Sequence, residues 1–163
     1  MDMQLETGLT RHTERQIQRI RAVKLIPTVE LERCVGAPFN MVAFADEAKP
    51  ERDLVYILVP QTENGVYPLG RHYRLMVEDG KVIDQRSFTK GCISLPVKPD
   101  NEGNRPAALT ISHLLDPVPT EVQVFSVLAM RVPLYVITAE NEAVWAIELV
   151  KGQPRIRLVE RED

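Results

Sequence analysis

Apolar residues recur along the chain with two different periods, and the first period is helical. In residues 10–26 the apolar positions follow three-residue steps, which mark one face of an α-helix: Ile17, Ile20 and Val23. Thr10 or Thr13 can cap this helix, and Gln16 completes a capping box with Thr13. Pro27 is expected to end it. The sequence therefore predicts an amphipathic N-terminal helix.

A second, shorter helix is expected directly afterwards. Thr28 is its predicted cap, Glu30 and Glu32 stand in the favourable first turn, and Gly36 is its predicted left-handed end. Residues 1–36 are thus predicted to form a helical segment.

From residue 40 onward the pattern changes to short runs rich in Val, Ile, Tyr and Phe, separated by Pro, Gly, Asn and Asp. We predict strands at 41–45, 54–59, 71–77, 82–88, 93–97, 108–115, 122–128, 134–138, 144–149 and 155–159. Their short connections favour antiparallel pairing, because parallel crossovers need about a dozen residues or more. The predicted fold class is α+β: the helical segment packs on a predominantly antiparallel sheet within a β-rich body, residues 37–163. This sheet is a meander or a partly closed barrel.

The pair Asp79 and Gly80 is a two-residue turn signal that predicts a β-hairpin. The expected cross-strand pairs are Val77 with Val82, Leu75 with Asp84, and Tyr73 with Arg86. The face predicted to lie in the core carries Tyr73, Leu75, Val77, Val82 and Phe88. The opposite face, predicted to meet water or a ligand, carries His72, Arg74, Met76, Ile83, Gln85 and Ser87.

Residues 119–131 fit two kinds of element. Thr120 and Gln123 have the spacing of a capping box, which favours a helix, whereas the β-branched valines of the segment favour a strand. We predict a strand and keep the helix as the alternative.

Composition narrows the picture to one soluble domain over residues 1–163, since a chain of this length with 44% hydrophobic residues can bury one sizeable core. The net charge of −3 argues against a general nucleic-acid binder. No uninterrupted apolar stretch approaches the roughly 18 residues of a membrane span. Arg and Glu interrupt the N-terminal residues, which excludes a signal peptide in the chain as written. We therefore expect a cytoplasmic protein, or a periplasmic one if a leader has been removed.

Cys34 and Cys92 are too few and too far apart in sequence for a zinc site. They are either buried thiols or, in a mature exported chain, one disulfide. Metal sites and cofactors are not expected, because the chain lacks metal-ligand spacings and phosphate-binding glycine motifs.

Candidate chemistry is limited to a few polar residues. Cys92, His113 and Asp116 are the residue types of a thiol nucleophile, a base and an orienting carboxylate, so a small hydrolase that uses Cys92 and His113 is one hypothesis. Against it, Cys92 opens an apolar strand with no helix N-terminus to stabilise a thiolate.

The segment from Asp116 to Glu121 contains two prolines that make it rigid. Asp116, Thr120 and Glu121 can therefore form a preorganised polar site near His113, although a stiff connection between strands explains the same residues. The favoured hypothesis is a non-catalytic binding or protein-interaction module whose partner is an unknown protein or a small ligand. That partner would meet this segment and the polar hairpin face. A homo-oligomer joined through an exposed edge strand is a further possibility.

Three stretches, 70–92, 111–125 and 133–148, resemble an uncharacterised family of small proteobacterial proteins. The resemblance covers about the C-terminal two-thirds of the chain and implies no activity. Because the family is mostly exported, it implies an oxidising compartment and a disulfide between Cys34 and Cys92. Gln123 stands where we expect a histidine in the family.

Overall fold

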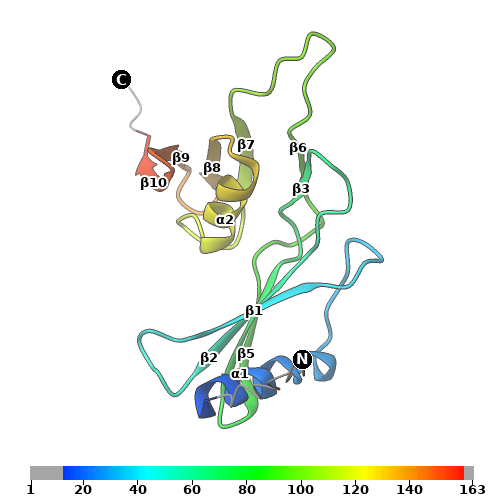
Figure 1. Ribbon diagram of the computed structural model, residues 1–163. Helices are drawn as coiled ribbons and strands as arrows, with labels where there is room; N and C mark the ends of the chain where they lie inside the picture. The colour runs from blue at the N-terminus through cyan, green and yellow to red at the C-terminus, as the bar shows by residue number, and fades with distance from the viewer. Residues whose placement is uncertain (1–12, 160–163) are drawn as a thin grey trace, which may run out of the picture.

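The computed structural model describes residues 13–159, which form an α+β fold, the predicted class (Figure 1). In chain order its elements are α1 (Glu14–Val23), η1 (Ile26–Thr28), β1 (Asn40–Ala45), β2 (Asp53–Leu58), β3 (Val66–Pro68), β4 (Tyr73–Glu78), β5 (Lys81–Ser87), β6 (Ser94–Pro96), β7 (Leu109–His113), α2 (Glu121–Met130), β8 (Leu134–Thr138), β9 (Ala143–Val150) and β10 (Gln153–Leu158). Within this part of the chain, no helix has the length and apolarity that crossing a membrane requires.

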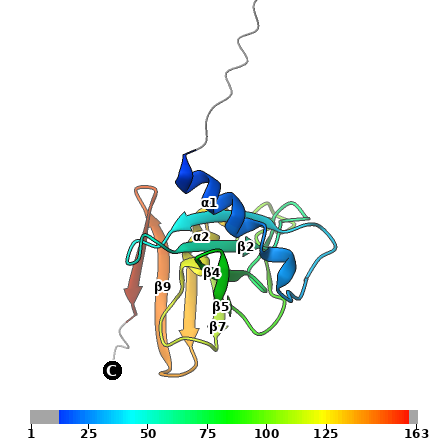
Figure 2. The ribbon, with the colours of Figure 1, turned by 90° about the horizontal axis from the view of Figure 1, so that it is seen from below.

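Helix α1 begins as predicted at the capping box of Thr13 and Gln16. The Thr13 backbone N–H donates to Gln16 Oε1 at 2.8 Å, and the Gln16 N–H donates to Thr13 Oγ1 at 3.3 Å. The second predicted helix is wrong: after the short η1, residues 29–39 form neither a helix nor a strand. We call residues 24–39 the strap. In Figure 2, α1 lies across the sheet that contains β2.

The first sheet is an antiparallel meander with the strand order β1-β2-β4-β5. One of its faces is covered by α1 and the strap. The buried side chains of this first cluster are Ala22, Val55, Ile57, Tyr73, Leu75 and Val77. Tyr73, Leu75 and Val77 are therefore core residues, as the hairpin pattern predicts.

A β-bulge changes the predicted register of the hairpin. Val77 pairs with Val82 as expected, but Leu75 pairs with Gln85 instead of Asp84, because the register shifts between Met76 and Val77. A shift of one residue moves every later side chain to the other face. The side chains whose predicted face is wrong are Gln85, Ser87 and Phe88.

The second sheet has the order β10-β9-β8-β7 and contains the main departure from the expected topology. β7 and β8 are parallel, and α2 connects them. The predicted strand at 122–128 is thus wrong and the helical alternative is correct. The side chain of Gln123 caps the Thr120 N–H, and burial of α2 against the sheets offsets the low helix propensity of its valines.

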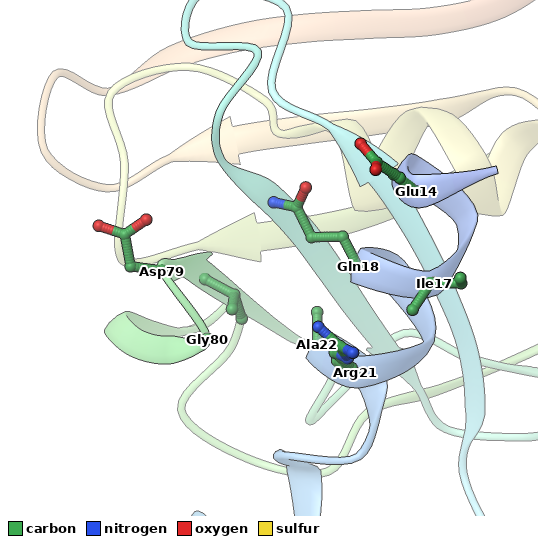
Figure 3. Close-up of a pocket in the computed structure, with 8 residues that line it drawn as sticks. Glu14, Ile17, Gln18, Arg21, Ala22, Asp79 and Gly80 are labelled. Carbon is green, nitrogen blue, oxygen red and sulfur yellow. The ribbon is translucent and has the colours of Figure 1, made fainter.

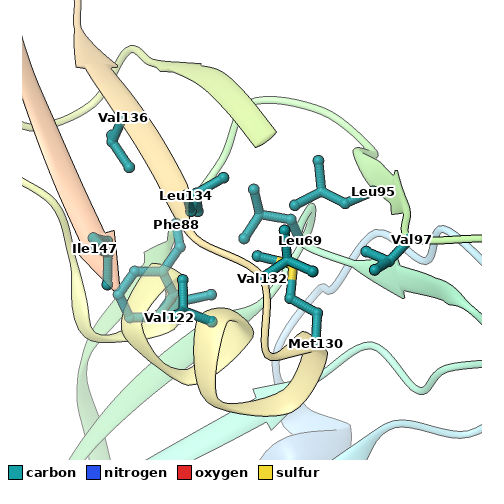
Figure 4. Close-up of a cluster of buried hydrophobic side chains, with 11 residues drawn as sticks. Leu69, Phe88, Leu95, Val97, Val122, Met130, Val132, Leu134, Val136 and Ile147 are labelled. Atoms are coloured by element: carbon teal, nitrogen blue, oxygen red, sulfur yellow. The ribbon is translucent and has the colours of Figure 1, made fainter. Parts of the chain in front are cut away.

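The second hydrophobic cluster joins α2 to both sheets (Figure 4). Its buried members are Leu69, Phe88, Leu95, Val97, Val122, Val127, Met130, Val132, Leu134, Val136 and Ile147. Phe88 belongs to this cluster because of the bulge, and its ring stacks on Tyr56 with 6.2 Å between the centroids. The short strands β3 and β6 pair with each other, and β3 has no counterpart in the sequence prediction.

Candidate functional site

The proline-containing segment between β7 and α2 brings Asp116 against both sheets. Asp116 Oδ2 accepts a hydrogen bond from Arg86 of β5, and His113 Nε2 at the end of β7 lies 2.8 Å from the same oxygen. The His113 ring is buried, and a proton on Nε2 is required for it to donate to the carboxylate. Sequence analysis paired His113 with Asp116 but missed Arg86, which the bulge turns toward this side of the sheet.

Glu121, at the start of α2, makes the second polar contact with the first sheet. Its Oε1 accepts hydrogen bonds from the Tyr56 hydroxyl at 2.9 Å and from Arg74 Nη1 at 3.2 Å. Burial raises the pKa of the Tyr56 hydroxyl, and the hydrogen bond to Glu121 raises it further. The phenol therefore stays protonated and donates. Arg74 and Glu121, both predicted site residues, do meet in the structure.

Cys92 forms a disulfide with Cys34, with 2.09 Å between the sulfurs. A sulfur in a disulfide carries no thiolate and cannot act as the nucleophile of the hydrolase hypothesis. Cys92 is therefore corrected from a candidate nucleophile to a disulfide partner. The pairing itself agrees with what the family resemblance implied.

His72 is buried and both of its ring nitrogens contact the backbone. The Val59 N–H donates to Nδ1 at 2.9 Å, and Nε2 lies 3.0 Å from the Pro68 carbonyl oxygen. Burial lowers the pKa of the His72 ring, which the Pro68 carbonyl only partly opposes. His72 is thus a neutral, buried side chain that joins the backbone at Val59 to the backbone at Pro68, and the prediction that it meets water or a ligand is wrong.

The remaining predicted binding residues lie apart from this cluster or are used by the protein itself. Gln85 Nε2 donates to the Glu30 carbonyl at 3.0 Å, and Ser87 Oγ donates to the Thr89 carbonyl at 2.7 Å, both beside the strap. Thr120 is buried at the cap of α2. The predicted site residues therefore occupy several places and do not form one site.

A groove that sequence analysis missed runs between the first sheet and α2 and has a volume of about 870 Å³. Its apolar walls include Val42 and Phe44 of β1, Leu54 and Leu58 of β2, and Phe125 of α2. Phe44 is 53% exposed and Phe125 is 47% exposed, although large apolar side chains are usually buried. Two sequence signals point here in hindsight: β1 has no charged residue, and α2 has only one, Glu121 at its start.

The groove continues past Phe125 into a smaller hollow of about 140 Å³. Leu58 and Phe125 line both, and the smaller hollow reaches Tyr67 and Ala129. The two hollows therefore adjoin at Leu58 and Phe125, and together they form a channel beside α2. We call this channel, with the outer edge of β1, the β1–α2 groove.

Another hollow, of about 570 Å³, lies between α1 and the β4–β5 turn (Figure 3). Glu14 and Arg21 of α1 line one side, and Asp79 and Gly80 of the turn line the other. All four are exposed to solvent, so this hollow offers little shielding from water to a ligand.

In comparisons with protein-family models, curated proteins and solved structures, nothing matches the chain. Among residues 13–159, three or more potential metal ligands nowhere come together.

Proposed function

We propose that the protein is a non-catalytic interaction module that binds an apolar polypeptide segment in the β1–α2 groove. The observation that carries this proposal is the uncovered apolar wall of the groove. A predominantly apolar helix such as α2 is normally buried, yet its Phe125, which lines the groove, is exposed, and so is Phe44 of β1, which lines the same groove. Contiguous exposed apolar surface of this kind is typical of interaction sites.

The polar groups of the groove favour a polypeptide over a compact small ligand. Small-molecule pockets place a few convergent polar groups around the ligand. Here the Tyr56 hydroxyl and one oxygen of Glu121 are already hydrogen-bonded within the protein, and Asp46 and Glu47 stand together at one end. A chain that offers several apolar side chains fits this distribution better.

The non-catalytic part of the proposal is supported by the residues that sequence analysis considered for catalysis or binding, because the protein itself already uses them. Asp116 and Glu121 both neutralise arginines of the first sheet, and Cys92 is held in the disulfide. The disulfide also favours an oxidising compartment such as the periplasm as the place where the module works.

The test is a selection of random twelve-residue peptides on the full chain, followed by calorimetric titration of the synthesised winners. Phe44→Ser and Phe125→Ser remove the apolar walls, and Ile156→Ser of β10 is the matched control, since Ile156 is 46% exposed but lies outside the groove. We expect each groove variant to weaken binding at least tenfold and the control to change it less than twofold. Winners that are insensitive to both groove variants, or no winners at all, would contradict the proposal.

A further inference from the structure

We infer that the segment bound in the β1–α2 groove is an extended strand that pairs with the free edge of β1 and carries a basic side chain at the acidic end. This inference rests on the proposed function and specifies its partner. β1 is an outer strand of the first sheet, and within residues 13–159 no strand pairs with its other side. Alternate N–H and C=O groups of an edge strand point outward, ready to pair with an added strand.

β1 lacks the features that protect two other sheet edges, β5 and β10, from such pairing. The edge strand β7 (L-T-I-S-H) is equally bare, but of these two bare edges only β1 lines the groove. The opposite edge, β5, carries Lys81, Asp84 and Arg86 and is bulged. β10 of the second sheet carries a proline and two arginines. By contrast, β1 reads N-M-V-A-F-A, with neither charge nor proline, and it pairs with β2 without a register shift. Charged residues, prolines and bulges are the usual means of blocking an edge, so their absence leaves the edge of β1 open to pairing beside the groove.

The groove determines which side chains the added strand needs. Val42 and Phe44 stand on the same face of β1 as the groove, since both line it, and successive strand residues alternate between faces. Every second side chain of the added strand therefore enters the apolar space between β1 and Phe125. The partner needs large aliphatic or aromatic residues at alternate positions, as in other cases of strand addition.

Charge at the end of the groove specifies one further residue. Arg19 lies 3.7 Å from the buried Asp53, and Glu121 pairs with Arg74, so these two groove charges are compensated within the protein. Over the described residues, Asp46 and Glu47 form no ion pair. Both line the groove directly after β1. A Lys or Arg of the partner would complement them.

A second copy of the chain fits this edge less well. In a two-fold antiparallel pairing of β1 with itself centred on Val42 or Ala43, Asp46 faces Pro38 or Asn40 of the other copy. Residues 37–40 contain no basic side chain, and Pro38 has no N–H to donate. The charge pattern therefore favours a different polypeptide.

The probes are two synthetic nine-residue peptides in which Val, Phe and Ile alternate with Thr, with Lys at the N-terminus of one and at the C-terminus of the other. Their affinities for the full chain are measured by fluorescence anisotropy. We expect one of the two peptides to bind. A peptide of the same composition, shuffled so that the apolar residues are consecutive, should bind at least tenfold more weakly. N-methylation of one alternate set of amides should abolish binding, and N-methylation of the other set should be tolerated, because only one set faces β1.

The charge is tested with the double variant Asp46→Asn, Glu47→Gln. This variant should bind the Lys peptide at least threefold more weakly than the parent protein does. Its affinity for a peptide with Gln in place of Lys should equal that of the parent. Glu102→Gln, in the exposed loop before β7, is the matched control.

Two results with selected peptides would overturn the inference while leaving the proposed function intact. The first is a selected peptide that depends on Phe125 but tolerates both N-methylated sets. The second is a selected peptide that depends on Phe125 but does not require alternate apolar residues. Failure of every peptide to respond to Phe44→Ser and Phe125→Ser would instead reject the proposed function. A dimer in analytical ultracentrifugation that Met41→Lys dissociates would identify a second copy as the occupant and overturn the inference.

Discussion

Asp116 connects the two sheets through a single carboxylate oxygen. It accepts from Arg86 of β5 and contacts His113 of β7, and the prolines that follow hold it in place. Asp116→Asn preserves the shape but leaves the partly buried Arg86 without its counter-charge. We expect the free energy of unfolding in urea at pH 7 to fall by about 2 kcal/mol, the scale of a hydrogen bond between charged groups.

The control for this change is Glu148→Gln, which breaks the more exposed pair with Arg157. Surface pairs contribute at most about 1 kcal/mol, so the control should lose clearly less stability than Asp116→Asn. Equal losses in the two variants would show that Asp116 is no more than a surface partner.

His72 gives the fold a pH dependence of known sign. Burial lowers the pKa of His72 in the folded protein below its usual value of 6.5, so the unfolded chain takes up a proton first as the pH falls. Stability from the neutral ring is present above pH 6.5 and is lost as the pH falls toward the folded pKa. We expect His72→Gln to be less stable than the parent at pH 7.5 but to lose less stability between pH 7.5 and pH 5, measured by urea denaturation. Parallel pH profiles would rule out this role.

Two capping boxes in different surroundings allow a matched comparison at the scale of elements. Gln123 caps the buried Thr120 N–H of α2, whereas Gln16 caps the exposed Thr13 N–H of α1. Gln123→Ala leaves a buried donor without an acceptor, which costs about 2 kcal/mol, whereas Gln16→Ala exposes its donor to water and costs less than about 1 kcal/mol. Urea denaturation of both variants measures the difference. A larger loss for Gln16→Ala would contradict the role of burial.

Elements with clear local signals were predictable from the sequence, and those decided by tertiary contacts were not. The strand at 134–138 was predicted with the bounds that the structure shows, because Pro133 and the polar residues after Thr138 delimit it. The segment of α2 carried opposing local signals, and its burial between two sheets decided the outcome. The bulge beside Val77 has no sequence signature, yet it sets the face of Gln85 and Phe88.

The candidate site shows the same limit. The pairing of His113 with Asp116 spans three residues, and sequence analysis placed them together. The β1–α2 groove instead joins Phe44 to Phe125, which are far apart in sequence. Tertiary packing of α2 beside the first sheet brings these two side chains to one groove.

At the scale of the whole molecule, the disulfide between Cys34 and Cys92 links the strap to the loop after β5. It closes a loop of 58 residues. In the chain-entropy model a loop of this length stabilises the fold by about 4 kcal/mol. We expect the double variant Cys34→Ser, Cys92→Ser to lose about this much in urea denaturation, and the reduced parent protein to match it. A loss below about 1 kcal/mol would show that the strap is held by its other contacts.

The same covalent link has a mechanical consequence. Every strand of the first sheet, from β1 to β5, lies between Cys34 and Cys92, so tension applied to the chain ends passes through the sulfur–sulfur bond and bypasses that sheet. In single-molecule pulling, the chain between Cys34 and Cys92, a sequence separation of 58, should hide about 200 Å of contour length until a reductant is added, at about 3.3 to 3.6 Å per residue. A partner strand paired with β1 would therefore stay bound to a sheet that bears no tension when the chain ends are pulled.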